Sequence, residues 1–175
     1  LAGRLQEVFP FDGLVLIETI AKDRLRVVDS RRRRLYIPGA LLGPEDIGEH
    51  ALELLRERNV IEGHNAELGG GIATRALADG VQRGAAVALR HDGGDLGYLV
   101  LSRVENQPFN QEECAFLDLL GTLLAQAIAN RRRLEASQRE AARSSLLNAI
   151  AVLLNRGEPP ETFFQHLAAR LQEIL

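Results

Sequence analysis

Residues 81–104 read VQRGAAVALRHDGGDLGYLVLSRV, two apolar runs separated by a short polar segment. The runs, residues 81–89 and 96–104, are rich in the aliphatic side chains that favour strands. The segment between them contains Asp92-Gly93, and Asp-Gly is a strong signal for a tight hairpin turn. The sequence therefore predicts an antiparallel β-hairpin here.

A long helix is expected directly after this hairpin. Asn110 is a good N-cap residue, and Glu113 three positions later completes a capping-box pattern. Leu, Ala and Ile dominate residues 116–128, and neither Gly nor Pro follows Gly121 until Gly157. We expect one helix of about 45 residues, roughly 65 Å long.

The same helix carries a heptad pattern. Leu120, Ala127, Leu134 and Ala141 recur every seven residues, and Leu117 and Leu124 extend this seam. An apolar row at this spacing is typical of helices that pair with one another. We therefore expect a parallel homodimer, held by this helix and by the apolar residues 146–154.

Upstream, the sequence predicts a second hairpin, with strands at residues 14–20 and 24–29 around a turn at Lys22-Asp23. A single surface helix is expected over residues 44–58, after a short helix over residues 1–9. Residues 60–80 read as an irregular loop over a cavity, with three consecutive glycines and a short helix at residues 72–77. A last helix is expected over residues 161–175.

Composition bounds the class of protein. The chain has 175 residues, a net charge of −3 and one cysteine, Cys114. An acidic balance argues against a nucleic-acid binder, and a lone cysteine excludes an intramolecular disulfide. No apolar run approaches the roughly 20 residues that cross a bilayer, and no signal peptide is evident. We expect a cytoplasmic protein with no membrane partner.

The sequence contains no catalytic or metal-binding motif. It has no Gly-x-Ser-x-Gly elbow and no His or Cys spacing that suits zinc. The irregular segment is the best place for a ligand pocket, because functional loops are often long and glycine-rich. We expect His64, Thr74, Arg75 and Arg83 to line it, with either arginine able to pair with an anionic ligand. The alternative is that these arginines only face solvent.

These elements resemble a GAF domain. The family has similar residues at the places of Gly97, Phe109, Glu112-Glu113, Leu117, residues 125–128 (AQAI) and Asn130. The resemblance covers about residues 1–135. It implies an α+β fold, with a central antiparallel sheet flanked by helices and a long C-terminal helix. Residues 136–175 are then a helical connector; they are also similar to the opening helices of a second GAF domain, or form helices that pack back on this one.

The resemblance implies a non-catalytic sensory domain of a bacterial signal-transduction protein. A sigma-54-dependent transcriptional activator is the preferred parent; a histidine kinase and a cyclic-di-nucleotide enzyme are the alternatives. The cyclic-nucleotide class is disfavoured because Glu113-Cys114 replaces its acidic pair. A bilin is disfavoured because Cys114 lies on the wrong element, and the reductases of this fold need pocket cysteines that are missing. Nothing supports haem or zinc, so the ligand stays open, as does a purely structural dimerisation role.

Overall fold

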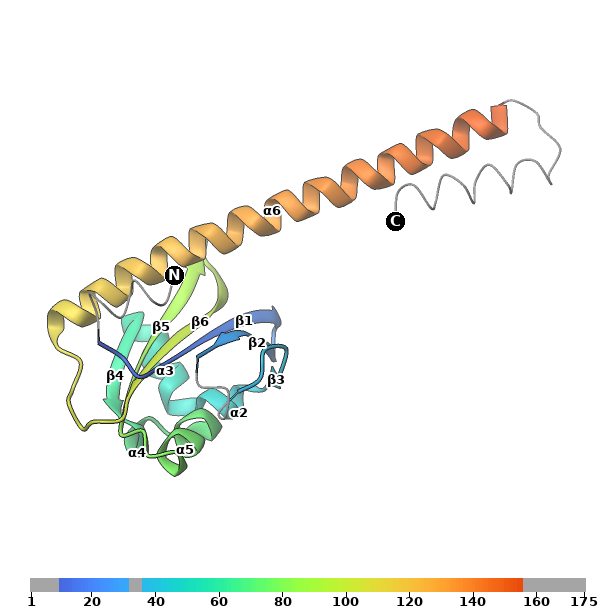
Figure 1. Ribbon diagram of the computed structural model, residues 1–175. Coiled ribbons are helices and arrows are strands. Elements are labelled where there is room, and N and C mark those ends of the chain that lie inside the picture. The colour runs from blue at the N-terminus through green and yellow to red at the C-terminus, as the bar shows by residue number, and fades with distance from the viewer. Residues whose placement is uncertain (1–9, 32–35, 156–175) are drawn as a thin grey trace. The chain divides into compact units, whose positions relative to one another are not determined.

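The computed structural model describes residues 10–31 and 36–155, and the elements in this part of the chain form one α+β arrangement (Figure 1). Six strands pair antiparallel in the order β3-β2-β1-β6-β5-β4. The GAF-like fold class predicted above is confirmed. In chain order the elements are β1 (Gly13–Ala21), β2 (Arg24–Ser30), β3 (Leu41–Leu42), α2 (Pro44–Ile47), α3 (Glu49–Arg58), β4 (Val60–His64), α4 (Asn65–Leu68), α5 (Gly70–Ala78), β5 (Arg83–His91), β6 (Gly94–Arg103) and α6 (Gln111–Asn155).

Both predicted hairpins are present. β1 pairs with β2 around the turn at Lys22-Asp23, and β5 pairs with β6 around Asp92-Gly93. Asp92 and Gly93 have φ angles of 50° and 75°. Two successive positive φ angles match the twist of paired strands, which explains why Asp-Gly stands at this turn. The strand expected at residues 81–89 begins later, at Arg83.

The sheet buries side chains on both faces. In β1, Val15 and Ile17 belong to one core and Leu14 belongs to the other, because successive side chains of a strand point to opposite faces. Helices α2 and α3 supply Ile47, Ala51 and Leu55 to the first core, and Leu68 of α4 and Ile72 of α5 pack against it. The beginning of α6 supplies Leu117 and Ala125 to the second. Each face is thus covered by helices, as expected.

The single helix predicted over residues 44–58 is wrong. The chain forms two helices, α2 and α3, separated by Gly48 at a φ of 96°. The break lets the backbones of Gly48 and Gly70 meet: a Cβ on Gly70 would lie 2.5 Å from the Gly48 nitrogen. Side-chain periodicity did not reveal this contact, because it is made by backbone atoms from distant segments.

The irregular loop predicted over residues 60–80 is also wrong, apart from its short helix. This segment contains β4, which pairs with β5, followed by α4 and α5. Gly70 and Gly71 are the first residues of α5, and a Cβ on Gly71 would lie 2.7 Å from the Asp46 carboxylate. The glycines allow close packing against α2 here and do not form a flexible loop.

Helix α6 starts as predicted. The Glu113 amide donates to Asn110 Oδ1 at 2.9 Å, and the Asn110 amide donates to Glu113 Oε2 at 2.8 Å. This reciprocal pair is the capping box, and it satisfies amides that a helix start leaves free. A Cβ on Gly121 would lie 2.6 Å from Val87 Cγ2, so α6 approaches β5 closely. None of the described helices is long and apolar enough to cross a membrane.

The chain divides into two compact units, Leu1–Ile128 and Ala129–Leu175. The boundary predicted at residue 135 stays a prediction. The helices expected over residues 1–9 and 161–175 lie outside the described residues. Leu117 is only 1% exposed and packs in the core of the first unit, so its predicted place in a dimer seam is wrong.

Candidate functional site

A small cavity lies between the sheet and the helices α3 to α5, where a ligand pocket was predicted. Its volume is about 40 Å³. This is close to the roughly 30 Å³ that one water molecule occupies and far below the roughly 300 Å³ at which ligand pockets begin. It is lined by Ile47, Ala51, Leu55, Ile61, Asn65, Leu68, Gly69, Ile72, Ala73, Gly84, Ala85, Ala86 and Val100.

Asn65 is the polar side chain of this lining, and it is buried. Its Nδ2 donates to the carbonyl oxygen of Val81 at 3.0 Å. A Cβ on Gly84 would lie 2.7 Å from Asn65 Oδ1, so the missing side chain at Gly84 makes room for the amide. The cavity is therefore an apolar space with one fixed polar side chain beside it.

Tyr36 lies in the core on the same face of the sheet and is 3% exposed. Its hydroxyl makes no hydrogen bond to any residue that the structure describes. Buried polar groups are nearly always hydrogen-bonded, so an exception needs an explanation. Burial raises the pKa of Tyr36, the charge of Arg75 and its side-chain contact with the hydroxyl lower it, and Asp46 raises it, so that the net pKa is above the usual value. The hydroxyl is therefore neutral and able to donate to an added partner.

Two charged side chains accompany Tyr36. The Arg75 guanidinium lies 5.2 Å from the centroid of the Tyr36 ring, and its Nη2 lies 3.6 Å from Asp46 Oδ1. Asp46 Oδ2 also accepts a hydrogen bond from the Gly43 amide at 2.9 Å. We name Tyr36, Asp46 and Arg75 the Tyr36 cluster. It joins a buried hydroxyl to an anion in the first turn of α2 and a cation in the last turn of α5.

The structure places the four predicted site residues in two pairs. His64 and Arg83 are opposite each other in the β4–β5 ladder, and Thr74 and Arg75 are neighbours on α5. None of the four is among the residues that line the small cavity. A shared role in binding one ligand stays a prediction.

Like Arg75, which pairs with Asp46, the other three side chains have partners within the domain. His64 Nε2 lies 3.1 Å from Gln82 Oε1, and its Nδ1 accepts from the Ala66 amide at the start of α4. The Thr74 hydroxyl donates to the carbonyl oxygen of Gly70 at 2.8 Å. Arg83 Nε donates to Asn106 Oδ1 at 3.0 Å, and its Nη1 lies 3.9 Å from Glu62.

Sequence reasoning missed Tyr36, Asn65 and the role of Asp46. Asp46 lies near a helix start, where an acidic residue is common, and no spacing around Tyr36 marks it as a site residue. A tyrosine in a chain with no tryptophan was the available signal. Whether its hydroxyl has a partner depends on which segments surround it.

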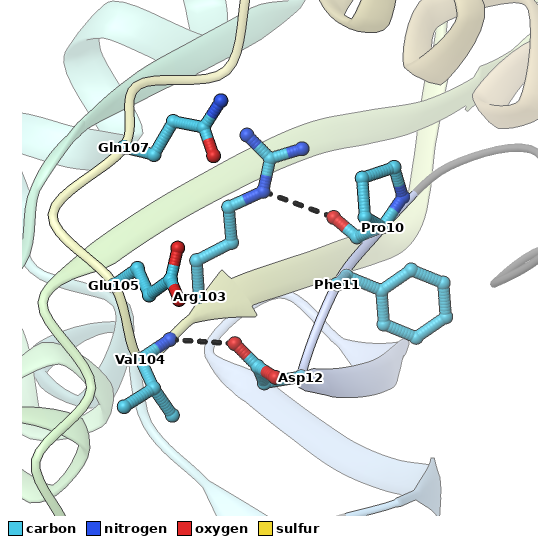
Figure 2. Close-up of a pocket in the computed structure, with 7 residues that line it drawn as sticks. All are labelled: Pro10, Phe11, Asp12, Arg103, Val104, Glu105 and Gln107. Atoms are coloured by element: carbon cyan, nitrogen blue, oxygen red, sulfur yellow. Dashed lines mark hydrogen bonds between the residues drawn. The ribbon is translucent and has the colours of Figure 1, made fainter.

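A larger cleft, of about 570 Å³, lies where β6 ends (Figure 2). Its central side chain, Arg103, is 5% exposed and donates to the carbonyl oxygens of Pro10 and Pro108 and to Glu113. Its guanidinium also lies 4.1 Å from the centroid of the Phe109 ring. The Val104 amide donates to Asp12 Oδ2 at 2.7 Å. These contacts tie separate segments together, so the cleft is a structural junction.

The described residues give little support to metal or thiol chemistry. No group of three or more His, Cys, Asp or Glu side chains within them is placed to hold a metal ion. Burial raises the pKa of Cys114, and Glu62 and Glu113 raise it further. A raised pKa keeps a thiol protonated and unreactive. Cys114 is thus a packed residue of α6.

No protein-family model matches the sequence, and no curated protein is similar to it in sequence. Solved structures do share its fold. The GAF domain of a two-component sensor histidine kinase from Bacillus halodurans matches with a TM-score of 0.65 and 15% identity, over 77% of this chain and 92% of that one. The Stigmatella aurantiaca phytochrome photosensory core module matches with a TM-score of 0.64 and 18% identity, over 98% of this chain and 40% of that one.

A third similar structure is the GAF domain of a phosphoenolpyruvate-protein phosphotransferase from Coxiella burnetii. It matches with a TM-score of 0.56 and 24% identity, over 77% of this chain and 81% of that one. The chain therefore has a GAF-like fold. At these identities the similarity establishes the fold and leaves the ligand open.

Proposed function

We propose that this chain is a non-catalytic sensory domain of a bacterial signalling protein, which responds to a small molecule and passes the response along α6. The similar structures come from a sensor histidine kinase, a phytochrome and a phosphotransferase, and this supports a signalling role. A sigma-54-dependent transcriptional activator is our preferred parent protein. A histidine kinase and a cyclic-di-nucleotide enzyme are the alternatives.

The observation that carries this proposal is helix α6. It is 45 residues long, and Leu117 and Ala125 in its first half are buried against the sheet. Beyond residue 128, Leu134, Leu147 and Val152 are more than half exposed. Leu134 is on the predicted heptad row, and apolar side chains at heptad spacing favour pairing with another helix. We therefore propose that α6 forms a parallel homodimer and carries a shift or rotation away from the sheet.

The Tyr36 cluster supports ligand binding on the opposite face of the sheet. A polar ligand atom would accept a hydrogen bond from the Tyr36 hydroxyl, and Arg75 would attract a negative charge beside it. The small cavity has no room for such a ligand. Binding would thus have to displace α5 from the sheet, and this displacement would be the signal.

A purely structural dimerisation module without ligand is the second candidate. The volume of about 40 Å³ between the sheet and the helices favours it, because this space is too small for a ligand as the domain stands. The ion pair between Arg75 and Asp46 then serves packing alone. The two candidates differ only in whether any small molecule stabilises the folded chain.

Thermal unfolding of the full chain with pooled metabolites separates the two candidates. A ligand at about 100 times its Kd stabilises the folded state by about 2.7 kcal/mol, and the melting temperature rises accordingly. We expect Arg75→Gln to abolish the rise and Arg58→Gln, an exposed change on α3, to leave it intact. If no pool raises the melting temperature, the dimerisation module is the better account.

A further inference from the structure

The outer edge of the sheet, beside β4, carries a polar cluster that the proposed function does not use. Asn59 lies between α3 and β4, and its amide donates to the carbonyl oxygen of Leu55 at 3.2 Å. Its own carbonyl oxygen accepts from the Ala88 amide at 3.0 Å. The backbone of Asn59 is therefore fixed to the last turn of α3 and to β5.

The Asn59 side chain extends these contacts to α6. Its Nδ2 donates to the carboxylate of Asp118, and its Oδ1 accepts from Arg90 Nη1 at 3.5 Å. Arg90 Nη2 also donates to the carbonyl oxygen of Leu55 at 2.9 Å, and its Nε donates to Asp95 at 2.9 Å. One amide side chain thus joins α3, the β5–β6 hairpin and α6.

These contacts connect the two faces of the sheet. Leu55 of α3 packs in the core on one face, and Leu117, the neighbour of Asp118, packs in the core on the other. Asn59 directly precedes β4, the last strand of the sheet, so the contacts pass beside the start of this strand. A displacement of α3 would therefore be transmitted to α6 through these hydrogen bonds.

Few residues other than asparagine meet the demands at position 59. The φ angle is 58° and the ψ angle −40°, a backbone conformation that glycine adopts most easily and that residues with a side chain rarely adopt. An asparagine amide both donates and accepts, as the contacts to Asp118 and Arg90 require. Glycine would keep the backbone and lose the side-chain contacts. Aspartate would place a second carboxylate against Asp118.

We propose that Asn59 is a positioning residue that couples the last turn of α3 to α6. A displacement of α3 would be passed through the Asn59 amide to Asp118. This polar link would couple α3 to α6 in addition to the packing of both helices against the sheet. Its use in signalling rests on the proposed function, whereas the mechanical coupling does not.

Amide hydrogen exchange of the full chain tests the coupling without any ligand. Asp118→Ala changes an exposed residue of α6, yet we expect the amides of residues 55–59 in α3 to exchange roughly tenfold faster, since one charge-assisted hydrogen bond is lost. Asp118→Asn keeps an acceptor oxygen and should retain slow exchange. Gln126→Ala, also exposed on α6, is the control and should leave residues 55–59 unchanged.

A second pair of variants tests the link from its other end. Asn59→Gly should speed exchange in residues 115–122 of α6, and combining it with Asp118→Ala should add nothing further. Asp92→Gly, at the other non-glycine residue with positive φ in the described chain, is the matched control.

Faster exchange confined to the helix that carries the substitution would overturn the coupling. It would also be overturned if the exchange rates of the double variant rose by the product of the two single effects. Neither result depends on a ligand. If hydrogen exchange shows the coupling but no metabolite raises the melting temperature, the proposed ligand sensing is wrong and the coupling stands.

Discussion

At the scale of single residues, the ion pair between Arg103 and Glu113 lies partly buried where α6 begins. Burial alone would raise the pKa of Glu113, but hydrogen bonds from Arg103 and Asn110 and the charge of Arg103 hold it below its usual value of 4.5. A carboxylate with a lowered folded-state pKa stabilises the fold above its unfolded pKa. That stability is lost as pH falls through the folded pKa.

We therefore expect Glu113→Gln to destabilise the domain by about 1.5–3 kcal/mol at neutral pH, because Arg103 loses its counter-charge. The difference in the free energy of unfolding between the variant and wild type should shrink as the pH falls below the usual carboxylate pKa. Urea unfolding of both proteins across this range measures the effect. Glu112→Gln, an exposed neighbour, is the control. A difference independent of pH would contradict the assignment.

A second prediction at this scale concerns the buried hydroxyl of Tyr36. Removing a buried hydroxyl that has no partner deletes a desolvation cost, so Tyr36→Phe should be neutral or stabilise the free chain by up to about 1 kcal/mol. Tyr98→Phe is a control on the same face of the sheet. Thermal unfolding measures both. A loss of 2 kcal/mol or more, on the scale of a broken buried hydrogen bond, would mean that the hydroxyl already has a partner.

At the scale of elements, the contact between the α2–α3 break and the start of α5 depends on backbone proximity. Gly70→Ala should destabilise the domain by more than 2 kcal/mol, because its Cβ would overlap the Gly48 backbone in addition to the cost of positive φ. Gly80→Ala is the matched control, since Gly80 has a φ of 78° and no atom lies within 4 Å of a Cβ there. It should cost only about 1–2 kcal/mol. Equal losses in urea unfolding would show that the contact is not tight.

At the scale of the whole molecule, α6 bears on assembly. Leu134 is 60% exposed and lies on the predicted heptad row. If α6 pairs in parallel, Leu134→Glu places two like charges at the seam and should shift the chain from dimer to monomer. Ala136→Glu, a change at an exposed position off that row, is the control. Light scattering at micromolar concentration measures the mass. A wild-type monomer would contradict the dimer.

Much of the fold could be predicted because its signals are local. The capping box of Asn110 and Glu113 lies within one turn of chain, and the Asp92-Gly93 turn within two residues. These residues restrict the local backbone conformation whatever the fold of the rest of the chain. The apolar runs of β1, β2, β5 and β6 likewise have few ways to bury themselves. These elements were predicted within two or three residues.

Tertiary structure alone decided the candidate site. The Tyr36 cluster comes from a loop, α2 and α5, and the bridge at Asn59 joins α3, β5 and α6. Neither set has a sequence spacing, because its geometry depends on long-range strand pairing and on glycine contacts such as Gly48 with Gly70. The sequence by itself determined the class of fold through local hydrogen bonding and hydrophobic pattern. Which polar groups meet, and which stay without a partner, was decided only when distant segments packed.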